Sequence, residues 1–152
     1  MKKVFLMILG TAAFIAVVGY YTNGKPFQKP TTKEVKINNT DISVEMADTA
    51  TKRAKGLSGR TELGNNSGML FVIDPKDNEP IFWMKGMLVP IDIIWIKNNQ
   101  IIQIGQNVPI PAPNTADKDL KLYKPSAPVD YVLEVNVGFT FKNNIKVGDK
   151  IN

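Results

Sequence analysis

The sequence predicts an α+β domain built mostly from antiparallel strands, barrel-like or sandwich-like, with about eight short strands and one short helix, preceded by an N-terminal transmembrane helix. Three observations lead to this prediction. Apolar residues after position 33 form short segments that are rich in Ile and Val and separated by Asn, Gly and Pro. Only one later segment has the start and stop signals of a helix. Residues 4–21 contain no charged side chain.

The N-terminal region predicts membrane association. Two lysines precede the 18 uncharged residues 4–21, which as a helix would span roughly 27 Å, enough for the hydrocarbon core of a bilayer. Residues 1–21 are expected to form a signal anchor rather than a cleaved signal peptide, because Val17 and Gly19 make a poor cleavage site. The lysines predict a single-pass protein of the cell membrane with a cytoplasmic N-terminus and an extracytoplasmic domain. Cleavage would instead predict secretion.

A linker over residues 22–32 separates this segment from a globular domain over residues 33–152. The linker holds an Asn-Gly pair and two prolines, with few residues that could be buried. Within the domain, strands are expected where apolar residues alternate with polar ones or form a short run. These segments are residues 35–37, 42–46, 68–73, 81–84, 91–97, 100–104, 129–137 and 145–151.

Asparagine pairs predict two hairpin turns. Asn38-Asn39 follows the first strand segment, and Asn98-Asn99 follows the fifth. Asparagine tolerates the positive φ angles that tight hairpins require, so each pair predicts an antiparallel neighbour. Residues 108–120 contain three prolines and are expected to form a loop, because proline cannot donate a hydrogen bond within a sheet.

The predicted helix covers residues 50–55. Asp48 or Thr49 can cap its N-terminus, since their side-chain oxygens accept hydrogen bonds from free backbone N–H groups. Gly56 then follows as a typical residue just past a helix C-terminus.

The absent residue types exclude several classes of site. The chain has no histidine and no cysteine, which excludes a Ser-His-Asp triad, a Cys-His dyad, thiolate or imidazole metal sites, and disulfides. The acids Asp92, Glu134 and Asp149 lack the spacing of a calcium-binding loop. We therefore expect neither a cofactor nor a metal site.

The charge distribution argues against nucleic acid as a partner. The formal net charge is +5, and residues 1–40 carry all of this excess, with six lysines and one glutamate. The remainder of the chain has equal numbers of acidic and basic residues. It therefore lacks the positive excess that phosphate binding normally requires.

Several motifs together resemble the domain of unknown function 192 family. They are residues 53–60 (RAKGLSGR), 68–72 (GMLFV), 82–85 (FWMK), 90–94 (PIDII), 132–138 (VLEVNVG) and 147–149 (VGD). The resemblance extends from Ile42 to Ile151. It implies a small β-rich domain, often behind a signal or anchor, with no established activity. The chain has Gly86 and Met87 where the family usually has Asn-Thr. If that amide and hydroxyl contact a ligand in relatives, this chain is expected to bind it differently or not at all.

One segment suggests a functional site. Residues 82–96 set Lys85 and Asp92 within an apolar, aromatic stretch, on either side of an expected strand break. Charges in such surroundings usually need partners, and loops that join strands often carry sites. We expect Lys85 to pair with Asp92 or with Glu134.

These residues predict a ligand-binding cleft. The candidate binding residues are Arg60, Trp83, Lys85, Asp92, Tyr123 and Glu134. Trp83 adjoins the strand break and could contact a ligand, whereas Trp95 is expected in the core. The leading hypothesis is a non-enzymatic, membrane-tethered extracytoplasmic domain that binds a small molecule, a glycan or an envelope protein.

Three other hypotheses remain open. A glycosidase-like hydrolase could use Asp92 and Glu134 as a general acid and base, provided that the two carboxyl groups converge. Ser58 could act as a nucleophile with Lys85 as its base, although the glycine-flanked serine is better explained as a turn. A structural accessory of an envelope complex would need no site at all.

Overall fold

The computed structural model describes residues 31–152. The predicted membrane segment over residues 1–21, and the linker up to residue 30, lie outside these described residues. Within residues 31–152, no helix is long and apolar enough to cross a membrane.

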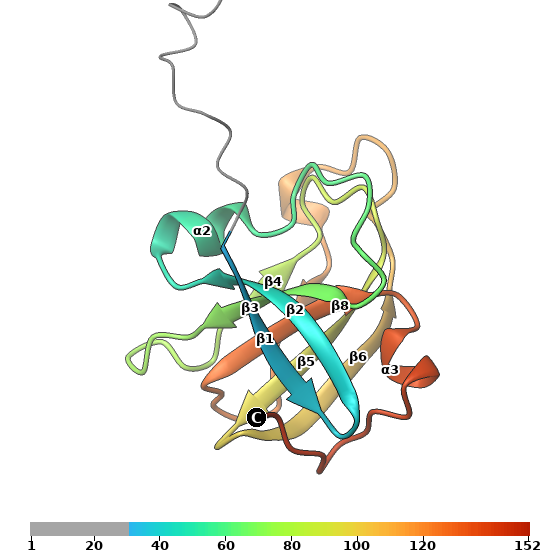
Figure 1. Ribbon diagram of the computed structural model, residues 1–152. Coiled ribbons are helices and arrows are strands. Elements are labelled where there is room, and N and C mark those ends of the chain that lie inside the picture. The colour runs from blue at the N-terminus through green and yellow to red at the C-terminus, as the bar shows by residue number, and fades with distance from the viewer. Residues whose placement is uncertain (1–30) are drawn as a thin grey trace, which may run out of the picture. The chain divides into compact units, whose positions relative to one another are not determined.

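Eight strands form two sheets (Figure 1). Six strands form the main sheet in the order β1-β2-β3-β8-β5-β6, and β4 pairs antiparallel with β7 in a separate ribbon. The strands are β1 (Thr32–Ile37), β2 (Thr40–Ala47), β3 (Ser67–Val72), β4 (Phe82–Trp83), β5 (Ile91–Lys97), β6 (Gln100–Val108), β7 (Leu122–Tyr123) and β8 (Tyr131–Asn136). The helices are α2 (Ala50–Lys55), the 3-10 turn η1 (Asp117–Asp119) and α3 (Phe139–Lys142).

The short-range predictions are confirmed. Asn38 has a φ of 54° in the β1-β2 hairpin, and Asn98 and Asn99 have φ values of 48° and 58° between β5 and β6. Thr49 caps α2 by accepting a hydrogen bond of 3.2 Å from the Lys52 backbone N–H. Each of these elements follows from local sequence, because the residue at the turn or cap has a side chain suited to that backbone.

The long-range arrangement is mostly antiparallel, as predicted, with one parallel pair. β2 and β3 run parallel and are connected through α2, while β8 lies between β3 and β5 and is antiparallel to both. The final predicted strand is reduced to two bridges, Ile37 with Ile151 and Gln100 with Lys150. These bridges join the C-terminal segment to both edge strands at one end, but β1 and β6 do not pair with each other, so the sheet is not a closed barrel.

Further elements differ from the sequence-based expectation. β6 continues to Val108, beyond the predicted end at residue 104, and β7, η1 and α3 were not predicted. α3 is a single turn of four residues that begins after Gly138, whose φ is 74°. A helix this short has too few residues to show a periodic apolar pattern.

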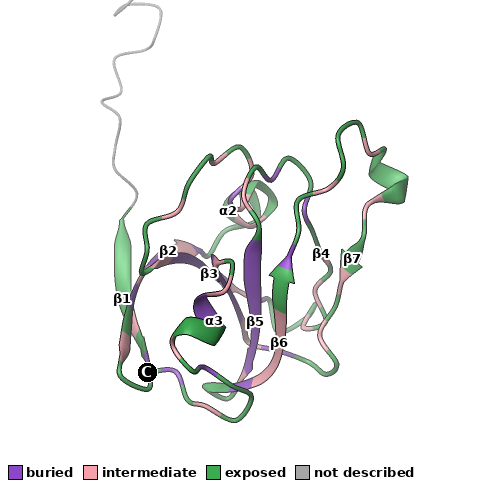
Figure 2. Ribbon diagram, turned by 90° about the vertical axis from the view of Figure 1, so that its right-hand side faces the viewer, coloured by how far each residue is buried: buried purple, intermediate pink, exposed green. Residues whose placement is uncertain are grey.

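Both faces of the main sheet bury apolar side chains, which is why β5 is buried at six of its seven positions. Figure 2 shows β5 as a nearly continuous buried strand near the centre of the domain. The side chains on one face belong to a cluster of buried apolar residues that we call the α3-side core. Its members are Ile37, Ile42, Val44, Leu70, Ile94, Ile96, Ile101, Leu133, Val135, Phe139, Ile145 and Ile151.

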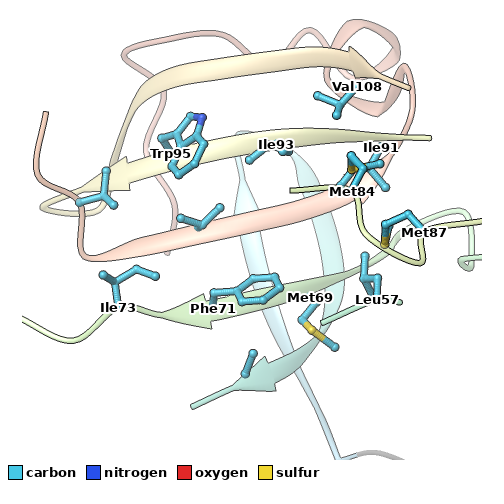
Figure 3. Close-up of a cluster of buried hydrophobic side chains, with 13 residues drawn as sticks. Leu57, Met69, Phe71, Ile73, Met84, Met87, Ile91, Ile93, Trp95 and Val108 are labelled. Atoms are coloured by element: carbon cyan, nitrogen blue, oxygen red, sulfur yellow. The ribbon is translucent and has the colours of Figure 1, made fainter. Parts of the chain in front are cut away.

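The opposite face packs against a second cluster, which we call the pocket-side core (Figure 3). Its members are Ala47, Leu57, Met69, Phe71, Ile73, Met84, Met87, Ile91, Ile93, Trp95, Val108, Val129 and Val132. Trp95 is only 1% exposed, which confirms its predicted place in the core. The loops that supply Leu57, Met84 and Met87 cover this face and create the hollow described next.

Candidate ligand pocket

A pocket of about 570 Å³ opens beside the pocket-side core. The C-terminal half of α2, the loop after it, β3 and the segment around β4 all contribute to its walls. The lining residues are Arg53, Ala54, Lys55, Gly56, Leu57, Ser58, Phe71, Ile73, Asp74, Asp77, Pro80, Ile81, Phe82, Trp83, Lys85, Met87 and Glu134. The volume falls within the range of small-molecule sites in proteins.

Two loops are held together at the pocket wall. The backbone N–H of Gly59 donates a hydrogen bond of 2.8 Å to the carbonyl of Gly86, and the Ser58 hydroxyl lies 3.4 Å from the same oxygen. Gly86 has a φ of 67°, and a Cβ at this position would clash with the Ser58 Oγ. The backbone conformation and the close approach of the two loops therefore both favour glycine at residue 86.

Glu134 is the one buried acid that faces this pocket. It lies in the middle of β8, opposite Met69 of β3 and Ile93 of β5, and is 5% exposed. Among the described residues, no hydrogen bond or ion pair involves its side chain, and no fully enclosed side-chain oxygen lacks a partner. Its carboxyl group must therefore keep some access to the pocket that it lines.

Burial changes the acid-base chemistry of Glu134. Loss of water around the carboxyl group raises its pKa from the ordinary 4.5 to about 8, because an apolar environment disfavours the charged form. At neutral pH the side chain is therefore mostly a neutral carboxylic acid. Such a group can donate one hydrogen bond and accept others.

Other charged groups around the pocket are mostly engaged elsewhere. The Lys85 ammonium lies 2.5 Å from Asp117, and Arg53 donates a hydrogen bond of 3.2 Å to the carbonyl of Val72. Lys55, Asp74 and Asp77 complete the set of ionisable lining residues. The pocket thus combines a neutral acid at its base with charges of both signs around it.

Aromatic rings form part of the wall. The Phe71 and Phe82 rings meet edge to face with centroids 5.0 Å apart, and Phe82 meets Trp95 in the same way at 5.4 Å. Trp83, by contrast, is 55% exposed. Its indole is available to a ligand or a partner.

The structure brings three of the predicted site residues together and separates the other three. Trp83, Lys85 and Glu134 line the pocket. Tyr123 lines a second, smaller pocket of about 190 Å³, and its partial burial raises the pKa of its hydroxyl group. Arg60 and Asp92 line neither pocket.

Arg60 belongs to a partly buried ion pair. Its guanidinium donates hydrogen bonds of 2.5 and 2.6 Å to the two carboxylate oxygens of Glu45 on β2. This paired geometry raises the pKa of Arg60, and it ties the loop after α2 to the sheet. This ion pair is a structural contact, and the ligand contact predicted for Arg60 stays a prediction.

Asp92 is fully buried beneath α3. One carboxylate oxygen accepts from the backbone N–H groups of Asn107 and Gly138, at 2.9 and 3.1 Å. The other accepts from the backbone N–H and the hydroxyl of Thr140, at 3.0 and 2.6 Å. Four donors thus satisfy the hydrogen-bonding capacity of the Asp92 carboxylate, which links β5, β6 and the start of α3.

The expected pairing of Lys85 with Asp92 or Glu134 is wrong. Lys85 pairs with Asp117, which lies 32 residues further along the chain, and both side chains are more than half exposed. A surface lysine needs no buried counter-ion, so the apolar residues around it in sequence were misleading. Neither does any described contact join Lys85 to Ser58.

Asp92 and Glu134 lie on opposite faces of the sheet. Asp92 is directly opposite Val135, a member of the α3-side core, whereas Glu134 is directly opposite Ile93, a member of the pocket-side core. Directly opposed residues share a face, and successive residues alternate between faces. The strands therefore separate the two carboxyl groups, and the acid-base pair of a glycosidase does not form between them.

Sequence reasoning missed much of the pocket wall. Phe71 and Ile73 were assigned only to a strand, and Arg53 and Lys55 only to a helix. The glycine-rich turn over residues 56–59 was the available signal, because such turns let two backbones approach closely. The sequence predicts a helix stop and a turn there, with a nucleophilic Ser58 as the alternative, but no pocket wall.

Residues 32–152 match the model of the DUF192 family, described as "Uncharacterized ACR". The chain belongs to the domain of unknown function 192 family. This confirms the resemblance found in the sequence motifs. No curated protein matches the chain.

Two solved structures are similar to this member of the family. A protein of unknown function from Novosphingobium aromaticivorans DSM 12444 has a TM-score of 0.72 and 29% identity, with 84% of this chain and 89% of that chain covered. A protein described as a putative transcription regulator from Sinorhizobium meliloti 1021 has a TM-score of 0.72 and 24% identity, with 84% of this chain and 97% of that chain covered. The second likeness concerns the fold alone.

Proposed function

We propose that this domain is a non-enzymatic binding module that holds a small organic molecule in the pocket above Glu134. The observation that carries the proposal is the buried carboxyl group of Glu134, which has no partner among residues 31–152 and faces a hollow of about 570 Å³. Small-molecule sites are usually concave, with apolar and aromatic walls and a few polar groups that fix orientation. This pocket has such walls, and charged residues as well as Glu134 line it.

Energetics support a functional role for Glu134. An unpartnered polar group in an apolar environment costs free energy, and an apolar side chain of similar size would avoid that cost. Groups that weaken a fold are common where a protein binds or reacts with a ligand. Asp92 differs from Glu134 in this respect, because its carboxylate accepts four hydrogen bonds from the protein itself.

A blocked pocket tests this proposal. A library of small aromatic amines, alcohols and acids would be titrated by calorimetry into the full-length chain in lipid nanodiscs. We expect at least one compound to bind. Ser58→Trp should lower the affinity for it by about tenfold or more, because the indole would occupy the pocket next to Gly56 and Lys85.

Ser126→Trp is the matched control for this blocking variant. Ser126 is exposed and lies outside the pocket, so the same substitution should leave binding unchanged. Absence of binding across the library, or equal effects of the two tryptophans, would contradict the proposal.

The location proposed for this domain is the outer side of the cell membrane. Its support is the uncharged segment over residues 4–21 behind two lysines. There the pocket would meet small envelope molecules, while the exposed Trp83 would also suit a glycan or an envelope protein as the alternative partner.

Cell fractionation tests this location. The full-length chain should sediment with membranes and be released by detergent, and a chain lacking residues 1–21 should be found in the soluble fraction. An intact mass that corresponds to a chain beginning near Tyr20 would indicate cleavage and secretion instead.

A further inference from the structure

We infer that the ligand carries a positively charged amine, which forms an ion pair with Glu134 and displaces the proton of its carboxyl group. This inference rests on the proposed function and names the class of ligand. Three features of the pocket support it: the buried acid Glu134, the aromatic residues of the lining, and the protein partners of the basic residues.

Glu134 determines which charge the pocket can best accept. Glu134 is 5% exposed, lines the pocket and has no side-chain partner among the described residues. A carboxylate offers acceptors only, so its best complement is a group with several donors and a positive charge. An ammonium group provides both, and an ion pair is strongest where little water screens it.

Two of the three basic residues of the lining are already engaged by protein atoms. Lys85 is paired with Asp117, and Arg53 is bonded to the carbonyl of Val72. The Lys55 ammonium lies toward Gly59, 3.6 Å from where a Cβ would be at that residue. Asp74 and Asp77 add two acids to the same lining, so a ligand carboxylate would meet both of them as well as Glu134.

The aromatic residues favour a cation with an apolar body. Phe71, Phe82 and Trp83 all line the pocket. The faces of aromatic rings carry negative charge density and attract cations, while the remaining apolar wall suits a hydrocarbon or aromatic group. An aralkylamine satisfies both requirements.

Binding must release a proton if this inference is correct. Burial raises the pKa of Glu134 to about 8, so the free side chain is mostly protonated at pH 7. The ammonium group keeps all of its protons, the O–H bond of Glu134 breaks, and that proton passes to solvent. The charges balance, because a neutral acid and a cation become an ion pair and a free proton.

Three matched probes test the charge of the ligand. They are 2-phenylethylamine, 2-phenylethanol and 3-phenylpropionate, titrated by calorimetry into the full-length chain in nanodiscs. We expect the amine to bind most tightly and to release close to one proton at pH 7, measured in buffers of different ionisation enthalpy. Its affinity should rise by about tenfold between pH 6 and pH 7, where ionisation of the acid limits binding.

Glu134→Gln is the variant for this test. It keeps the shape of the side chain but cannot ionise, so the preference for the amine, the proton release and the pH dependence should all disappear. Glu62→Gln, at an exposed acid outside the pocket, should change none of them. The measurements on the unmodified chain remain decisive even if Glu134→Gln folds poorly.

The outcomes separate this inference from the proposed function. If the alcohol or the carboxylate binds as tightly as the amine, or if the amine binds without proton release, the inference is wrong while the pocket remains a binding site. If none of the three probes binds and the compound library also fails, both are wrong.

Discussion

Asp92→Ala is expected to lower the free energy of unfolding by about 3–5 kcal/mol. The carboxylate of Asp92 accepts three backbone N–H groups and the Thr140 hydroxyl, and both Asp92 and Thr140 are fully buried. Truncation would leave these donors without their acceptor, and the two donors of Thr140 lie where no water can replace it. Chemical denaturation of the variant and the unmodified chain measures the difference.

Asp41→Asn provides the matched control. Asp41 lies 3.6 Å from Lys36, and both side chains are at least half exposed, so the loss should be under about 1 kcal/mol. A similar small loss for Asp92→Ala would show that the segment around α3 satisfies its own backbone without the carboxylate.

The stability of the domain is expected to fall by roughly 4–5 kcal/mol as the pH rises from about 4.5 to about 8, because Glu134 must ionise in an apolar site. Its pKa is about 8 in the folded chain and 4.5 ordinarily. The folded state therefore binds the proton more tightly than the unfolded state. The stabilising contribution is fully present below pH 4.5 and is lost as the pH approaches the folded pKa.

Glu134→Gln should remove this decline between pH 5 and pH 8, while Glu62→Gln should retain it. Asp48, Asp130 and Asp149 have lowered pKa values because their carboxylates accept hydrogen bonds. They contribute stability above about pH 4, with the opposite sign, and so do not overlap this window. Urea denaturation across the pH range measures the slope. An equal slope in the two variants would contradict the assignment to Glu134.

Local features of the fold could be predicted because single residues determine them. The asparagines of the two hairpins and the Thr49 cap each fit a backbone conformation that few residues adopt well. The parallel β2-β3 pair and the place of β8 between β3 and β5 could not be predicted. They depend on contacts between segments far apart in the chain, which local patterns do not encode.

The candidate site was predicted in part for the same reason. Lys85 was found because it interrupts an apolar segment, Trp83 because it adjoins the expected strand break, and Glu134 because it is an acid within a buried strand. Whether Glu134 shared a face with Asp92 depended on the register of β5 and β8, and a shift of one residue would have reversed the answer. The partner of Lys85 lay in the proline-rich loop and carried no sequence signal.

Glu134 connects the stability of this domain with its proposed function. Burial of Glu134 lowers the stability of the fold above pH 5, and it also keeps the carboxyl group neutral inside the pocket. A bound amine would recover part of that cost, since ligands that bind only the folded state stabilise it. Stability and ligand binding should therefore depend on pH through one group.

The most direct measurement is a pH titration of the Glu134 carboxyl carbon by ¹³C NMR, in the full-length chain labelled at glutamate and assigned with Glu134→Gln. We predict a midpoint of about 8 in the free chain, and a clearly lower midpoint when 2-phenylethylamine is bound. A midpoint near the ordinary 4.5 in the free chain would contradict the presence of a neutral, unpartnered acid in the pocket.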